Sequence, residues 1–147
     1  MNMIYSAGDL AFLTACLDDI QTRMQELLRS HRSRGDREET LKSLTRIQQA
    51  RQALAARKDG EIVMTLNDLR VFYIVVFSKR DELNRLLDVP GRPAGLQDDL
   101  LACVSSCNSI LRVIRSNVAE EGFDPDAFAA SCAGVSLAAL PDGPDGP

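Results

Sequence analysis

The chain has 147 residues, of which 45% are hydrophobic and 26% charged, and its formal net charge is −4. A chain of this length can form one globular domain with its own core. No apolar run approaches the roughly 20 residues that a membrane-spanning helix needs, and the start of the chain lacks the basic region of a secretory signal. We therefore expect a cytoplasmic protein that does not associate with membranes.

Two amphipathic helices are predicted in the first 58 residues. Apolar residues from Leu10 to Leu28 recur at helical spacing on one face, with Asp9 as the helix cap. Gly35 ends that pattern. A second helix is predicted from Asp36 to Lys58, because its first turn is acidic, its last turn is basic and a glycine follows it.

The third segment allows two structures. Thr65 and Asp68 form the pattern of a helix N-cap, and a helix from Leu66 to about Asp88 is preferred because no glycine or proline interrupts it. The stretch 71–77 is apolar all round and rich in β-branched and aromatic residues, which also favour a strand. In that alternative, residues 62–64 form the partner strand of a hairpin. A helix that is apolar on every side must be covered on every side.

A loop rich in glycine and proline, residues 90–95, precedes a fourth predicted helix from Leu96 to Glu121. A short helix follows from Pro125 to Cys132, and the end of the chain lacks side chains that pack. We therefore predict an all-α fold, a four-helix antiparallel bundle with a short C-terminal helix and a disordered tail. Its apolar stripes are expected to pack together at small crossing angles. Residues 1–134 form the single domain, and residues 135–147 form the flexible tail.

Side chains suited to catalysis or metal binding are sparse. His31 is the only histidine, and Cys103 and Cys107 are the only closely spaced cysteines. A cysteine nucleophile or a zinc site needs further partners at suitable spacing. We therefore predict no enzyme activity, no catalytic residues, no metal and no cofactor, and we expect the cysteines to pack in the core.

Charge is divided unevenly along the chain. Residues 31–58 carry eight basic and three acidic side chains, whereas residues 59–147 carry seven basic and fourteen acidic ones. A basic stretch in an acidic protein either balances its own fold or attracts an anionic partner. Residues 31–58 contain no aromatic side chain on which bases could stack, so nucleic-acid binding is the weaker alternative.

Four cations of the second helix are candidate partner-binding residues. Lys42, Arg46 and Arg57 share its outward face, whereas Arg51 falls among its apolar positions. An unpaired arginine inside a bundle would cost on the order of several kcal/mol. Arg51 therefore reaches out to solvent, pairs with an acid of the chain, or meets a carboxylate of a partner. The acids that fit the second explanation are Asp18, Asp19 and Asp68.

The apolar band 71–77 exceeds what one neighbouring helix covers. Phe72 and Val76 are therefore predicted to contact a partner chain, and a symmetric homodimer is expected. The alternative for this band is a cavity for a small apolar ligand. The lining of that cavity would be Phe72, Tyr73, Phe77, Cys103 and Cys107.

Together these features favour a non-catalytic protein-binding module that occludes or presents a partner surface. Small acidic helical proteins of bacterial type often act as immunity proteins, antitoxins, secretion chaperones or adaptors. Two alternatives stay open: a nucleic-acid-associated regulator that uses residues 31–58, and a bundle that binds a small apolar ligand.

Overall fold

The computed structural model describes residues 2–4, 6–30, 34–56 and 61–140. In chain order its elements are β1 (Asn2–Ile4), α1 (Ala7–Ser30), α2 (Arg34–Ala55), β2 (Glu61–Val63), α3 (Leu66–Leu87), α4 (Ala94–Glu120), α5 (Pro125–Cys132) and the 3-10 turn η1 (Leu137–Ala139). The predicted fold class is confirmed: four long helices pack antiparallel, and a short helix follows them. Within the described ranges, no helix has both the length and the apolar character needed to span a bilayer.

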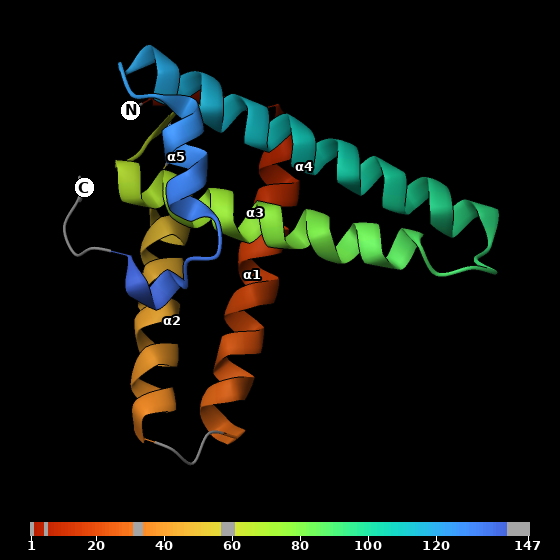
Figure 1. Ribbon diagram of the computed structural model, residues 1–147, viewed down its shortest axis with the longest axis horizontal. Coiled ribbons are helices and arrows are strands. Elements are labelled where there is room, and N and C mark those ends of the chain that lie inside the picture. The colour runs from red at the N-terminus through yellow and green to blue at the C-terminus, as the bar shows by residue number, and fades with distance from the viewer. Residues whose placement is uncertain (1, 5, 31–33, 57–60, 141–147) are drawn as a thin grey trace.

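The molecule consists of two helical hairpins that cross at a steep angle (Figure 1). Helices α1 and α2 lie side by side as one hairpin, and α3 and α4 form the other. The inner half of α3 crosses α1 and also contacts α2 and α5, whereas its outer half continues with α4 beyond the first hairpin. The small crossing angle expected for all four helices therefore holds within each hairpin and not between the two.

Helix α3 begins with the capping box that the sequence predicts. The hydroxyl of Thr65 accepts a hydrogen bond from the backbone N–H of Asp68 at 3.1 Å, and Asp68 Oδ2 accepts one from the N–H of Thr65 at 3.3 Å. The helix runs from there to Leu87 without interruption. The strand alternative for residues 71–77 is therefore wrong, because tertiary contacts rather than β-propensity decide the structure of a buried segment.

The N-terminal segment differs from the prediction in two ways. Strand β1 pairs antiparallel with β2, in a register that places Met3 opposite Ile62. Helix α1 starts earlier than expected, because Ser6 Oγ accepts a hydrogen bond from the N–H of Asp9 at 3.1 Å. Asp9 therefore lies in the first turn, where its charge suits the helix dipole, and it does not cap the helix.

The inner half of α3 is the centre of the core. Between Leu66 and Val76 only Asp68 and Ile74 are partly exposed, and Leu69 has no exposed surface. Helices α1, α2, α4 and α5 all contact α3. The chain itself thus covers the apolar band on every side, as a helix of this pattern requires.

The last described residues pack against α2. Leu137 and Leu140 are buried, and η1 contacts α2. Side chains three residues apart point the same way in a 3-10 turn, so both leucines can reach the same surface. The flexible tail predicted from residue 135 is therefore wrong for residues 135–140, and the rest of that tail, 141–147, lies outside the described residues.

The cap of α3 gives a direct test of local stability. We expect Thr65→Ala to lower the free energy of unfolding by about 1 kcal/mol, because the N–H of Asp68 loses its acceptor. Urea denaturation followed by circular dichroism measures this change. Thr22→Ala is the control, because that exposed hydroxyl bonds only to the carbonyl of Asp18 within α1, and a change below about 0.5 kcal/mol is expected. Equal losses in the two variants would contradict the capping role.

Candidate functional site

The four cations of the second helix that are predicted to bind a partner differ in their exposure and in their contacts. Lys42 is exposed and Arg46 is half-buried, and both line a groove between α2 and the C-terminal segment. Arg51 forms an ion pair with Asp18 of α1, with 3.0 Å between Nε and Oδ1. The internal pair, one of three explanations left open for Arg51, is thus confirmed. Arg57 lies outside the described residues.

The other two predicted contact residues lie in the core. Phe72 and Val76 expose no surface, because neighbouring helices cover the inner half of α3. A partner cannot touch them in the folded chain, which corrects that prediction. The residues expected to line a cavity for a small ligand do not share one environment. Cys107 is fully buried, whereas Phe77 is 40% exposed. Phe77 stacks on Tyr73 with 6.2 Å between ring centroids.

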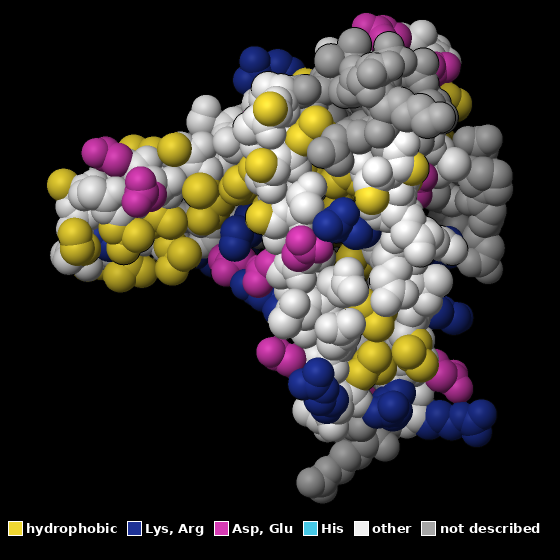
Figure 2. Space-filling model, turned by 180° about the vertical axis from the view of Figure 1, so that it is seen from behind, with side chains coloured by type: hydrophobic (Ala, Val, Ile, Leu, Met, Phe, Trp, Pro, Cys, Tyr) yellow, Lys and Arg dark blue, Asp and Glu magenta, His cyan; other side chains and the backbone are white. Residues whose placement is uncertain are grey.

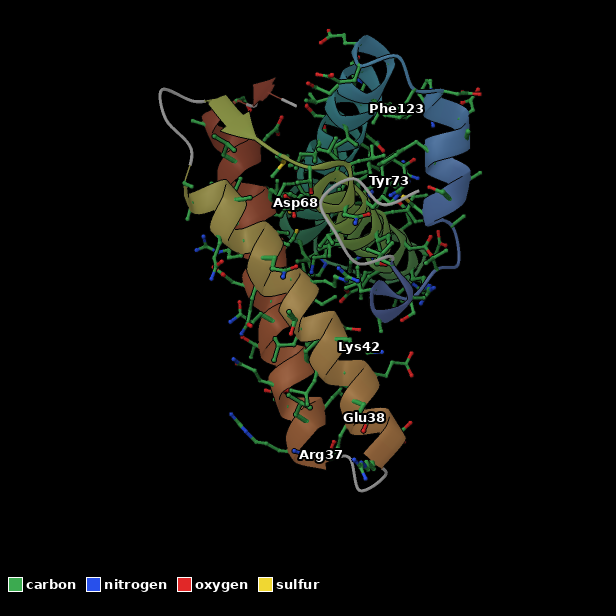
Figure 3. All side chains as sticks on the ribbon, turned by 90° about the vertical axis from the view of Figure 1, so that its left-hand side faces the viewer. Arg37, Glu38, Lys42, Asp68, Tyr73 and Phe123 are labelled. Carbon is green, nitrogen blue, oxygen red and sulfur yellow. The ribbon has the colours of Figure 1, made fainter. Side chains whose placement is uncertain are left out.

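The groove beside α2 has a volume of about 460 Å³, and residues of the C-terminal segment form one of its walls. Its lining residues are Leu41, Lys42, Thr45, Arg46, Gln49, Ala138 and Leu140. A second hollow of about 300 Å³ adjoins it toward the start of α2 and shares Lys42. Figure 3 shows Lys42 and Glu38 on the side of α2 that faces the C-terminal segment. Leu41, 47% exposed, supplies an apolar contact point.

Arg46 holds the C-terminal segment of the chain at this groove. Its Nη2 donates a hydrogen bond to the carbonyl oxygen of Leu140 at 2.6 Å, where the backbone is extended. A second polar contact is the hydrogen bond that Ser136 Oγ donates to Glu39 Oε1 at 3.4 Å. Leu137 and Leu140 of the segment are buried, and η1 contacts α2. The surface of α2 therefore binds a short segment with a 3-10 turn through apolar anchors and through a cation that donates a hydrogen bond to a backbone carbonyl.

Most other cations of α2 are engaged within the chain. Arg34 pairs with a glutamate one turn further on, and Arg37 hydrogen-bonds a backbone carbonyl of α1. Arg51 is paired as well, so Lys42 is the one cation of α2 for which the described residues show no partner. Within the described part of residues 31–58, ion pairs with acids are thus shown for Arg34 and Arg51, and the other two arginines of α2 hydrogen-bond backbone carbonyls.

A second exposed surface lies on the outer half of the α3–α4 hairpin. Its members are large hydrophobic residues that are 45–54% exposed, and we call them the outer hairpin surface: Leu86, Val89, Leu96 and Leu101. Figure 2 shows hydrophobic side chains gathered over this end of the molecule. A cluster of exposed apolar side chains on a small protein indicates an interaction surface.

The outer hairpin surface was not predicted from the sequence. Leu83, Leu86 and Leu87 continue the helical pattern of α3, yet Leu83 is buried whereas Leu86 is 45% exposed. The pattern shows which face of a helix is apolar. It does not show where along α3 the covering helices end, and no local signal in the sequence marks that point.

Three cysteines lie near one another where α1 meets α4. Burial, and next the nearby thiol of Cys107, raises the pKa of the Cys16 thiol to about 12. Burial and the thiol of Cys103 raise the pKa of Cys107 to about 11. A thiol must ionise to act as a nucleophile. Neither of these two groups therefore supplies a nucleophile near neutral pH.

Other candidate groups for chemistry are few. His31 lies outside the described residues. In the part of the chain that the structure describes, no group of three or more histidine, cysteine and acidic side chains is placed to hold a metal ion.

Comparison with known proteins gives no relative: no family model, no curated protein and no solved structure matches this chain. The groove beside α2 and the outer hairpin surface are therefore the features from which its function must be inferred.

The raised thiol pKa values predict a loss of stability at high pH. The folded-state pKa of Cys16, about 12, lies above its ordinary value of 9.0. Below pH 9 the thiol is protonated in both states, so its contribution to stability is complete. As the pH rises toward 12, the unfolded chain ionises first and stability falls by up to about 1.4 kcal/mol per pH unit for each such thiol.

Urea denaturation at several pH values between 8 and 11 measures this loss. In Cys16→Ala the fall with pH should be clearly shallower, because one of the two strongly shifted thiols is gone. The raised pKa of Cys107 remains in the variant, so a smaller fall and not its complete loss is expected. Equal slopes in the two proteins would contradict the assignment.

Proposed function

We propose that this protein is a non-catalytic protein-binding module that holds an acidic segment of a partner protein in the groove beside α2. The observation that carries the proposal is the hydrogen bond from Arg46 to the carbonyl oxygen of Leu140. It is made at the edge of a groove that also presents Lys42 and the exposed side chain of Leu41. Cations beside an apolar anchor suit a segment that carries both acidic and apolar side chains.

The size of the groove and the chain's own C-terminal sequence support this partner chemistry. A volume of about 460 Å³ lies within the range of about 300–1,000 Å³ that is usual for binding sites. The segment that α2 already holds carries Leu137 and Leu140, and Asp142 and Asp145 follow in the sequence. We therefore expect the segment of the partner protein to carry the same pattern, leucines followed by acidic residues.

The chemistry of the described side chains supports a role in binding rather than in catalysis. The two most strongly shifted thiols stay protonated near neutral pH. Four free cysteines fit a reducing compartment, and we place the protein in the cytoplasm of a bacterium. Immunity proteins, antitoxins, secretion chaperones and adaptors all act by covering or presenting a surface, and the groove supports that class of function.

Fluorescence anisotropy with a labelled eight-residue peptide of alternating leucine and glutamate tests the proposal. We expect saturable binding, and we expect Lys42→Glu to weaken it about tenfold or more, which corresponds to about 1.4 kcal/mol. A peptide of alternating leucine and lysine should not bind. Both expectations follow from the charge of the groove, in which Lys42 has no partner among the described residues.

The matched control is Arg29→Glu, which makes the same charge change at an exposed position in the last turn of α1. It should leave the affinity within about twofold, because Arg29 lines neither of the two hollows beside α2. Equal weakening in both variants, or equal binding of the lysine peptide, would overturn the proposed site.

A further inference from the structure

We infer that residues 135–140, which we call the C-terminal strap, are autoinhibitory: they occupy part of the partner's site on α2 and leave it when a partner segment binds. The inference rests on the proposed function, because it concerns the regulation of the same groove. Three observations carry it: the contacts of the C-terminal strap, the link that joins it to α5, and the part of the groove that it leaves open.

The C-terminal strap is held by contacts that another peptide segment can also make. Leu137 and Leu140 are buried, and α2 is the main element that η1 packs against (Figure 1). Arg46 donates its hydrogen bond to a main-chain carbonyl, that of Leu140, and every peptide segment carries such a carbonyl. The hydrogen bond from Ser136 to Glu39, at 3.4 Å, is exposed to solvent. A partner segment with two leucines therefore supplies equivalent contacts.

An exposed link joins the C-terminal strap to α5. Helix α5 ends at Cys132, and both Ala133 and Gly134 are exposed. Gly134 has a φ of 67°, which glycine adopts without strain. Apart from its chain neighbours, no described residue has an atom within 4 Å of the place that a Cβ of Gly134 would take. The link can therefore change its conformation while α5 stays packed against α3 and α4.

The C-terminal strap leaves part of the proposed site open. Leu41 is 47% exposed, and the described residues show no partner for Lys42. Both side chains line the groove of about 460 Å³, in which Ala138 and Leu140 also take part. A partner segment can thus bind first to the open part of the groove and then replace the leucines of the C-terminal strap.

A tethered competitor lowers the affinity of a site for its partner. A segment on a short link has an effective concentration on the order of millimolar at its own binding site. The apparent affinity for a partner equals the intrinsic affinity multiplied by the fraction of chains in which the competitor is released. A C-terminal strap that is released in about one chain in ten therefore weakens partner binding about tenfold.

Leu137→Ser in the full chain tests the inference, because Leu137 is buried but lines neither of the two hollows beside α2. In fluorescence anisotropy, the labelled peptide of alternating leucine and glutamate should bind this variant about tenfold more tightly than the unmodified chain. The matched control is Leu101→Ser, the same change at a side chain that is 49% exposed on α4. It should leave the affinity within about twofold. Circular dichroism checks that both variants keep their helices.

A second probe is a labelled peptide with the sequence of residues 135–147. It should bind Leu137→Ser, and the leucine–glutamate peptide should displace it, because both occupy one site. It should bind the unmodified chain about tenfold more weakly, because the C-terminal strap of that chain already occupies the site. The same peptide carrying Leu137→Ser is the control and should bind neither chain.

The outcomes separate this inference from the proposed function. If Leu137→Ser binds the leucine–glutamate peptide no more tightly than the unmodified chain does, the segment is a fixed wall of the groove and the inference is wrong, whereas the proposed function stands. Tighter binding of the leucine–lysine peptide as well would also overturn it, because the gain would then come from newly exposed apolar surface. Absence of binding to both chains would overturn the proposed function and, with it, the inference.

Discussion

The structure depends on the need to cover the inner half of α3 on every side. Leu69, Phe72 and Val76 expose no surface, and four other helices contact α3. Helix α3 has 22 residues and is therefore about 33 Å long. Two helices side by side span only about 20 Å. Because α3 crosses the first hairpin, that hairpin covers only the inner part of α3. The outer part of α3 packs mainly against α4.

Both candidate interaction surfaces follow from this crossing. The outer ends of α3 and α4 keep apolar side chains exposed, because the first hairpin crosses α3 nearer its start (Figure 1) and reaches its outer half at the ion pair between Arg23 and Glu82. On the other hairpin, α2 contributes one face to the core and keeps a second face on which the C-terminal segment packs. The groove beside Arg46 and Lys42 lies on that second face. The two surfaces belong to different hairpins.

Features set by neighbours in the sequence were predictable. The capping box of Thr65 and Asp68, the N-terminal proline of α5 and the apolar stripes all follow from local spacing. For Arg51 the sequence left three explanations open, and one of them, a pair with Asp18, Asp19 or Asp68, includes the carboxylate that the structure shows. Physical rules that act over one or two helical turns were therefore sufficient for the four long helices and for the cap of α3, whereas the cap of α1 was assigned to Asp9 instead of Ser6.

Features set by contacts between distant segments were not predictable. The packing of residues 135–140 on α2 depends on two leucines, too few to form a periodic pattern. The pairing of β1 with β2 depends on segments almost sixty residues apart in the sequence. Phe72 was expected at an interface, and the structure buries it completely, whereas Leu86 on the same helix is 45% exposed. Whether an apolar residue is covered depends on the length and direction of the helices around it, which its own stretch of sequence does not contain.

Hydrogen exchange resolved by peptide mass spectrometry tests the central claim most directly. The claim is that the two halves of α3 differ: the chain covers residues 66–76, whereas the outer hairpin is covered only by α4. In dilute solution, amides of residues 69–76 should exchange only through global unfolding, and amides of residues 84–101 should exchange through openings of lower free energy. Equal protection of the two segments in dilute solution would contradict the account.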